Sequence, residues 1–212
     1  ANLSVRATDE FMQAVENDEE WQTRPVHNKE LADKMPKYKA RDLMKFIAEG
    51  AWECGDPGMQ FETTINMWHT AKNSGPINAS NPCSEYMFLD DTSCNLASLN
   101  LRKFQNEDGS IDIMGLENCV EITSTAMDLN YEFSSSPTKA IAQYSYDNRT
   151  LGLGYANLGA LLMSEGLAYD SDEARNIAAA ITSLMTSTVY ETSIEMAKKI
   201  GTFKEFKKNK ES

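Results

Sequence analysis

The longest regular pattern in the chain is a helical one near its end. From Asp172 to about Ile200, apolar residues recur every three or four positions and fall on one face of a helix. Asp170 and Glu173 have the spacing of a capping box, and Gly201 suits the position after the last turn. The fold must therefore accommodate one long helix, which we interpret as scaffold.

Shorter helical patterns alternate with strand-like segments upstream of this helix. Thr8 or Asp9 is expected to cap a first helix that carries Phe11, Met12 and Val15 on one face. Further helices are predicted over residues 41–52, 63–72, 112–131 and 156–165, and strands over residues 2–5, 21–26, 93–101 and 149–154. No internal repeat or low-complexity linker interrupts this order, which favours one α/β unit of mixed strands and helices.

Both ends of the chain are interpreted as cuts. The sequence opens on Ala1 without an initiating methionine and closes on a charged stretch, residues 203–210, without a clear structural stop. We therefore expect residues 1–212 to be a single unit and an internal fragment of a longer protein.

The charge and the hydropathy exclude two classes of partner. A formal net charge of −12 argues against the basic stripe that tracks a nucleic-acid backbone. No apolar run approaches the roughly 18 residues that cross a bilayer, and residues 1–20 lack the order of a signal peptide. We expect no nucleic acid, no membrane and a cytoplasmic location. A nucleotide substrate remains possible, because backbone N–H groups at helix N-termini can hold small phosphates.

The cysteines indicate neither a disulfide scaffold nor a metal site. There are four of them, at positions 54, 83, 94 and 119, and none forms a C-x-x-C pair. His27 and His69 have no ligand-like spacing, so no structural zinc is expected. Cys119 lies beside the apolar stripe of a predicted helix and is interpreted as a small packing residue.

The densest cluster of reactive side chains follows a loop-like stretch, residues 74–82, that is rich in Gly, Pro, Asn and Ser. Asn81, Cys83 and Glu85 alternate along the chain, and in an extended loop alternate side chains fall on one face. Pro82 favours extended geometry at the residue before it. Such a face would combine hydrogen bonding, sulfur chemistry and a proton acceptor.

A second cysteine, Cys94, lies eleven positions beyond Cys83, at the start of a predicted strand. Asp90 and Asp91 can form a turn between them, so the chain could bring the two sulfurs together. Two neighbouring thiols can give up two electrons and two protons as a disulfide. Two unrelated buried cysteines are the alternative that spacing leaves open.

The glycine pair Gly152 and Gly154 invites a dinucleotide-binding interpretation. The pattern G-x-G-x-x-G is not completed, because Asn157 occupies the third glycine position. We prefer the interpretation that these glycines let a helix lie close to a sheet.

The segment Asn-Pro-Cys-Ser-Glu at residues 81–85, followed by Ser-Cys-Asn-Leu-Ala-Ser-Leu-Asn-Leu at 93–101, resembles the finger loop and following strand of ribonucleotide reductase large subunits. Segments at residues 2–5, 9–12, 55–58 and 149–154 resemble the family in the same order. The resemblance extends to about Gly201. Pro82 and the sequence of residues 75–101 are most similar to the adenosylcobalamin-dependent class.

This resemblance implies specific roles for the residues of the loop. Cys83 would carry a thiyl radical that removes the 3′-hydrogen of a ribonucleotide, and Glu85 would accept the 3′-hydroxyl proton. Asn81 would hold the substrate hydroxyls. Cys94 would be one half of the reducing dithiol, with its partner outside the chain. The implied substrate-contacting residues are Ser80, Asn81, Pro82, Cys83, Ser84 and Glu85.

The resemblance also implies the setting of the chain. The fold would be part of the family's ten-stranded α/β barrel around a central finger loop, and the fragment alone would be inactive. Adenosylcobalamin would start the radical, with a separate metal-containing subunit as the alternative source. Nucleotide effectors bound mainly outside the fragment, a thioredoxin-type reductant and a homodimer are the expected partners. The choice between diphosphate and triphosphate substrates stays open.

Two other interpretations compete with this one. The chain could be an acidic, non-catalytic α/β binding module whose cysteines are structural. It could also be a two-electron thiol enzyme with Cys83 as nucleophile, although neither His27 nor His69 is obviously placed to activate that thiol.

Overall fold

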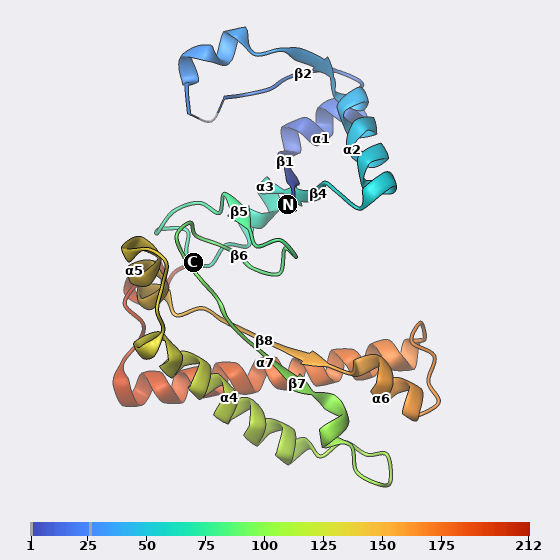
Figure 1. The fold of residues 1–212 in the computed structure, drawn as a ribbon, viewed down its shortest axis with the longest axis vertical. Helices are drawn as coiled ribbons and strands as arrows, with labels where there is room; N and C mark the ends of the chain where they lie inside the picture. The colour runs from blue at the N-terminus through green and yellow to red at the C-terminus, as the bar shows by residue number, and fades with distance from the viewer. Residues whose placement is uncertain (1, 26) are drawn as a thin grey trace. The chain divides into compact units, whose positions relative to one another are not determined.

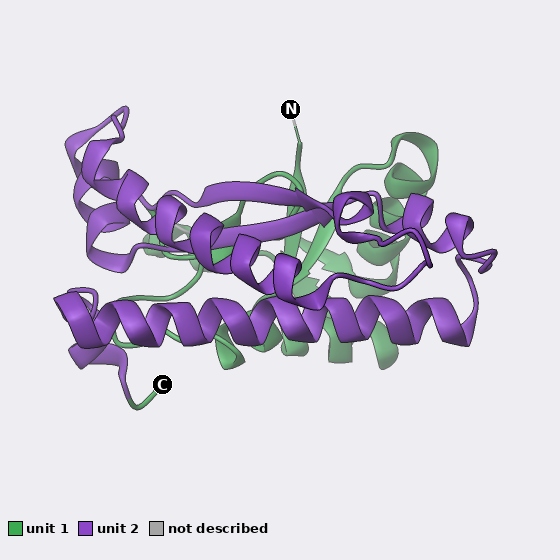
Figure 2. Ribbon diagram, turned by 90° about the horizontal axis from the view of Figure 1, so that it is seen from below, with its two compact units in different colours: residues 1–90, 211–212 green, residues 91–210 purple. Residues whose placement is uncertain are grey.

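The computed structural model describes residues 2–25 and 27–212, and it is a mixture of helices and short strands, as predicted. The chain forms two compact units, one of residues up to Asp90 with residues 211–212, and one of residues 91–210 (Figure 2). The expectation that residues 1–212 form a single unit stays a prediction.

The first unit carries three helices and six short strands among the described residues (Figure 1). In chain order they are β1 (Ser4–Ala7), α1 (Asp9–Glu16), β2 (Glu20–Gln22), β3 (Lys37–Lys39), α2 (Ala40–Cys54), β4 (Gly58–Phe61), α3 (Glu62–Met67), β5 (Ala79–Ser80) and β6 (Met87–Phe88), with a 3-10 helix at Lys29–Lys34. β1 pairs in parallel with β4, whereas β2 with β3 and β5 with β6 are antiparallel pairs.

A small apolar core holds α1 and α2 together. Ala7, Phe11, Ala14 and Ala40 are buried in it, and the ring of Trp21 packs edge-on against Phe11 at 5.4 Å between centroids. The hydroxyl of the residue before α1, Thr8, accepts a hydrogen bond from the Phe11 N–H at 3.3 Å. Of the two predicted caps, Thr8 is therefore the one used.

The second unit consists of a parallel strand pair covered by helices. Its elements are β7 (Asn95–Asn100), a 3-10 helix at Leu101–Phe104, α4 (Ile113–Phe133), α5 (Lys139–Asn148), β8 (Leu151–Ala156), α6 (Leu158–Ser164), α7 (Asp172–Ile200) and α8 (Phe206–Asn209). β7 and β8 pair in register from Asn95 opposite Leu151 to Asn100 opposite Ala156. Figure 2 shows α7 running the length of this unit beside α4.

The core of the second unit lies between the strands and the long helices. Its fully or nearly buried members are Leu99, Leu101, Leu116, Val120, Leu161, Ile181 and Met185. Leu99 of β7 and Leu101, the first residue of the 3-10 helix, are buried in this core, whereas Leu96 of β7 is 66% exposed. Cys119 packs against this core, as predicted.

Several predicted boundaries need correction. The helix predicted over residues 63–72 ends at Met67, and Trp68, expected on its buried side, is 76% exposed. The side chain of Asn66 explains the early end, because it bonds the N–H and the carbonyl of Ile77 at 2.9 and 3.1 Å and ties the following loop back to the helix. The strand predicted over residues 21–26 spans Glu20–Gln22, and its last residue lies outside the described residues.

The start of α7 is also corrected. Ser171, not Asp170, is the N-cap, because its backbone is extended and its hydroxyl accepts from the Ala174 N–H at 3.2 Å. Asp170 instead forms an ion pair with Arg175 at 2.6 Å. Helix α5 and strands β3 and β4 were not predicted.

Within residues 2–25 and 27–212, none of the helices combines the length and the apolar character needed to span a bilayer.

Candidate functional site

A tight hairpin presents the segment from Asn81 to Glu85. β5 and β6 pair with Ser80 opposite Met87, and the N–H of Asn81 donates to the Tyr86 carbonyl at 3.3 Å. Between them the chain turns, because the Ser84 N–H donates to the Asn81 carbonyl at 3.1 Å and Ser84 has a φ of 66°. The five residues therefore occupy a hairpin tip.

This geometry corrects the predicted extended loop. A turn closed between Asn81 and Ser84, with a left-handed residue before Glu85, does not keep the two-residue alternation of a strand. The sharing of one face by Asn81, Cys83 and Glu85 therefore cannot be argued from alternation. That these three side chains face one substrate stays a prediction.

A buried glutamine in β4 holds the hairpin through hydrogen bonds to two of its serines. Gln60 in β4 is 4% exposed, and its amide nitrogen donates to the Ser80 hydroxyl at 2.6 Å and reaches the Ser84 hydroxyl at 3.5 Å. Arg6 in β1 donates to the Gln60 oxygen at 3.3 Å and to the Ile77 carbonyl at 2.7 Å. Ser80 and Ser84 thus shape the loop, whatever else they contact, and β4, which supplies this support, was not predicted.

The side chain of Asn81 is only half engaged. Its oxygen accepts the Tyr86 N–H at 3.0 Å and thereby fixes the orientation of the carboxamide. Its amide nitrogen makes no hydrogen bond to the part of the chain that the structure describes. A donor held in place by its own oxygen is suited to hold a hydroxyl or an oxyanion.

The thiol and the carboxylate of the hairpin are both on the surface of the chain. Cys83 and Glu85 are exposed, as is Pro82 between Asn81 and Cys83. A thiol at a hairpin tip can be reached by a reactant from outside, and a carboxylate two residues away can accept a proton within hydrogen-bond reach of a bound substrate.

Cys94 lies in the second unit, immediately before β7. Its thiol is half-buried and lies 3.6 Å from the Asn95 carbonyl. The predicted turn at Asp90 and Asp91 is present, with Asp91 at a φ of 55°. The approach of the Cys94 sulfur to that of Cys83 stays a prediction, because the two residues belong to different units.

A tyrosine clamp holds the chain at Cys94, and sequence reasoning missed it. We use this name for the Tyr131 hydroxyl with the carbonyls of Ser93 and Thr150, at 3.0 and 2.5 Å. Burial raises the pKa of Tyr131, and the charge of a Cys94 thiolate adds to the rise. The phenol therefore keeps its proton and joins the entrances of β7 and β8.

Arg149 is the first residue of the family-like segment 149–154, and the sequence alone predicts no role for it. It ends α5 in a left-handed conformation with a φ of 51°. Its guanidinium donates to both oxygens of Asp128 at 2.9 Å and to Glu132 at 3.0 Å. Asp128 raises the pKa of Arg149 through these bonds. The fork fixes the start of β8 on α4.

The glycines of β8 have a different role from the one predicted. A Cβ atom added at Gly152 would lie 2.9 Å from the Cys94 sulfur and 2.5 Å from Cδ2 of Leu96. Gly152 therefore makes room on the face of the strands that carries Cys94, and no helix atom is among its close neighbours. At Gly154 the nearest atom would be the Ser98 hydroxyl oxygen at an ordinary 3.6 Å.

The histidine best placed for chemistry is a structural one. His69 is buried, and its Nε2 lies 3.0 Å from the Gly75 carbonyl. Burial lowers its pKa, which favours the neutral form of the ring. Across the described residues, no cluster of three or more His, Cys, Asp and Glu side chains is arranged to hold a metal ion.

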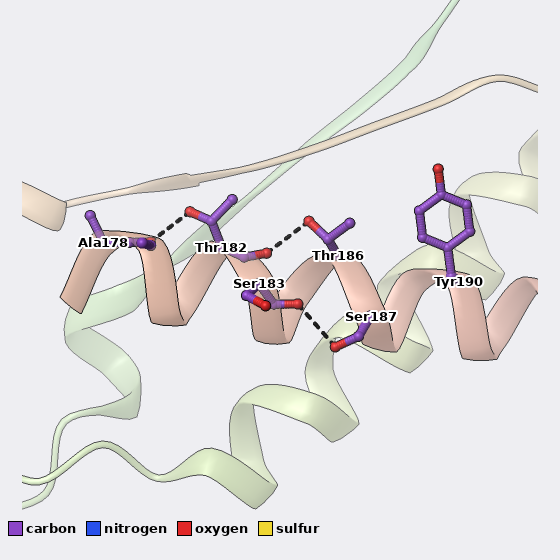
Figure 3. A pocket seen from close by; sticks show the side chains of 7 residues that line it. Ala178, Thr182, Ser183, Thr186, Ser187 and Tyr190 are labelled. Carbon is purple, nitrogen blue, oxygen red and sulfur yellow. Dashed lines mark hydrogen bonds between the residues drawn. The ribbon is translucent and has the colours of Figure 1, made fainter. Parts of the chain in front are cut away.

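An exposed face of α7 carries a shallow depression lined by small side chains and by Tyr190 (Figure 3). Thr182 donates to the Ala178 carbonyl at 2.8 Å, Thr186 to that of Thr182 at 2.7 Å, and Ser187 to that of Ser183 at 2.9 Å. Because these hydroxyl hydrogens are used within the helix and the lining carries no charge, we assign no chemistry to this face.

A carboxamide, a thiol and a carboxylate on one hairpin define a candidate site of cysteine chemistry. A family model described as the barrel domain of ribonucleotide reductase matches residues 1–212. The chain therefore belongs to the ribonucleotide reductase barrel-domain family.

Curated relatives are similar along the whole chain. A vitamin B12-dependent ribonucleotide reductase of Rhodopirellula baltica is 50% identical over 99% of this chain and 20% of its own length. One of Agrobacterium fabrum is 48% identical over 100% of this chain and 16% of its length. A vitamin B12-dependent ribonucleoside-diphosphate reductase of Thermoplasma acidophilum is 30% identical over 95% and 26%, respectively. The chain thus spans about a fifth of the length of these relatives.

Proposed function

We propose that the complete protein carrying this chain reduces ribonucleotides to 2′-deoxyribonucleotides by thiyl-radical chemistry. The observation that carries the proposal is the hairpin that presents Cys83 beside Asn81 and Glu85, in a chain that matches the reductase barrel domain throughout. The same match speaks against a binding module with structural cysteines.

In this proposal Cys83 starts and ends the reaction. Its thiyl radical takes the hydrogen atom from C3′, which gives a Cys83 S–H and a carbon radical on the ribose. Glu85 accepts the 3′-hydroxyl proton, and the 2′-hydroxyl leaves as water with a proton from the reducing thiols. As the intermediate is reduced, Glu85 returns its proton to the 3′-oxygen. The Cys83 S–H then returns its hydrogen to C3′, and the thiyl is restored.

Asn81 is the donor that holds the substrate oxygens. Its carboxamide oxygen is fixed by the Tyr86 N–H, and its N–H₂ group makes no hydrogen bond within the part of the chain that the structure describes. Negative charge that builds up on the 3′-oxygen as its proton leaves is stabilised by such a fixed donor.

Cys94 supplies half of the two electrons that the reaction consumes. Cys94 and a thiol outside this chain lose two electrons and two protons and form a disulfide, while the ribonucleotide becomes a deoxyribonucleotide and water. A thioredoxin-type reductant would restore the two thiols. Nucleotide effectors, a homodimer and a cytoplasmic location complete the proposed setting, with diphosphates or triphosphates as substrates.

The proposed cofactor is adenosylcobalamin, which the names of the relatives support. The residue of this chain that fits it is Cys83, because an exposed thiol at a hairpin tip can pass a hydrogen atom to a radical formed outside the chain. When bound, the cofactor supplies the first unpaired electron. A separate metal-containing subunit is the alternative source.

The test is Cys83→Ser in the complete protein. We expect deoxyribonucleotide formation to fall by a factor on the order of 10³ or more, since a hydroxyl cannot replace the thiol as hydrogen-atom carrier. Cys54→Ser is the matched control, because Cys54 is also exposed in the first unit and its bond to the Gly50 carbonyl is one that serine can make. Turnover retained by Cys83→Ser with an unchanged circular dichroism spectrum would overturn the proposal.

A further inference from the structure

The space occupied by the Cys94 thiol exists because residue 152 has no side chain. Leu96, two residues after Cys94, is opposite Gly152 in the parallel pair. An added Cβ at Gly152 would approach both the Cys94 sulfur and the end of the Leu96 side chain more closely than real atoms tolerate. Leu96 is largely exposed and can rotate away. A side chain at residue 152 would therefore push mainly against the Cys94 sulfur.

The backbone around Cys94 cannot easily relieve such a strain. The Ser93 N–H donates to the Ser145 hydroxyl at 2.9 Å, and the Asn95 carboxamide donates to the Met127 carbonyl at 2.9 Å. These bonds tie the residues on both sides of Cys94 to α5 and α4, and the tyrosine clamp ties the same segment to β8. With the backbone fixed, the thiol could move only by rotation about its one side-chain torsion.

Resting on the proposed function, in which Cys94 forms a disulfide, we propose that Gly152 is a positioning residue for this thiol. By lacking a side chain it admits the rotamer from which Cys94 reaches its partner sulfur, and the tyrosine clamp holds the backbone that carries it. A disulfide forms only within a narrow range of Cβ separations and torsions, so a rotated thiol forms it slowly.

The rate of disulfide formation at Cys94 tests this inference without turnover. The complete, reduced protein, free of nucleotide and cofactor, is treated with diamide, a diazene that accepts two electrons and two protons. Oxidised Cys94 is followed by mass spectrometry. We expect Gly152→Ala to slow the reaction about tenfold, the effect of an off-rotamer thiol. Gly154→Ala, on the same strand, should stay within about twofold of wild type, because its Cβ would meet its neighbours only at ordinary contact distances.

The outcomes separate the inference from the function on which it rests. If wild-type Cys94 forms no disulfide and Cys94→Ser keeps full turnover, the proposed role of Cys94 and this inference both fail. If wild type forms the disulfide and Gly152→Ala reacts as fast as Gly154→Ala, the positioning role alone is overturned.

A second variant keeps the inference testable if Gly152→Ala does not fold. Tyr131→Phe removes only the clamp hydroxyl, and we expect it to slow Cys94 disulfide formation about threefold. The alkylation rate of the exposed Cys54, which belongs to the other unit, should be unchanged. An unchanged disulfide rate in Tyr131→Phe would then overturn the proposal.

Discussion

Arg149 shows how much a single side chain contributes when its partners are buried. Its guanidinium and the Asp128 carboxylate are each 13% exposed, and they meet through two parallel hydrogen bonds. We expect Arg149→Lys to destabilise the entrance of β8 by about 1–2 kcal/mol, because an ammonium keeps the charge but cannot form the fork. Faster hydrogen exchange of residues 150–156 in the complete protein would show the loss.

Arg175 is the matched control for this prediction. It also pairs with two carboxylates, Asp170 and Asp172, but these are more than 90% exposed. Solvent screens such pairs, so Arg175→Lys should leave the hydrogen exchange of the first turn of α7 nearly unchanged. Equal effects of the two substitutions would show that the fork at Arg149 gives no special stability.

At the residue scale, sequence reasoning identified the chemically reactive groups but not their supports. Asn81, Cys83 and Glu85 stand within five positions of one another, so a short motif displays them. Gln60 and Tyr131 act on residues about 20 to 40 positions away in the chain. Such contacts depend on strand pairing and helix packing, which no local pattern contains.

At the element scale, the start of α7 depends on one hydroxyl. Ser171 accepts the Ala174 N–H, and removing that bond from the N-cap position of a helix costs about 1 kcal/mol. We expect Ser171→Ala to destabilise the first turn of α7 by this amount, measured as faster amide exchange at residues 172–176. Asp170→Asn is the control, because Asp170 is almost fully exposed and should change the exchange by less than about 0.5 kcal/mol.

If Asp170→Asn proved the more damaging of the two, the capping box inferred from the sequence would be the correct assignment and Ser171 would not be the cap. The structure favours Ser171, since Asp170 reaches Arg175 instead of the helix N–H groups.

Elements with a strong apolar stripe were predictable, and those with a polar buried face were not. The bounds of α2, α4 and α7 lie within about two residues of the prediction. A long helix repeats its apolar positions over several turns, so one atypical residue does not hide the pattern. Helix α5 was missed because the residues that it buries are Ser145, Asp147 and Asn148. Strands β3 and β4 were missed because their sequences, Lys-Tyr-Lys and Gly-Met-Gln-Phe, lack the run of β-branched and aromatic residues that is typical of a strand.

At the scale of the whole molecule, the surface of the chain carries more large apolar groups than a finished domain leaves open. Trp52 is 87% exposed and Phe133 is 84% exposed. Large aromatic side chains that are this exposed are candidates for places where other chain packs. The chain spans about a fifth of the length of its relatives, so the rest of the complete protein is available to cover these residues.

Oxidation of tryptophan in the complete protein tests this coverage. We expect hydroxyl radicals to modify Trp52 and Trp68 several-fold more slowly than in the same protein unfolded by denaturant, because buried indoles are shielded. Trp21, half-buried against Phe11 within the chain itself, is the internal reference and should be protected whether or not other segments cover this unit. The contrary outcome is that Trp52 and Trp68 react as fast as in the unfolded protein while Trp21 is protected. It would show that no other segment packs on them, and that these exposed aromatic residues belong to the outer surface of the complete protein.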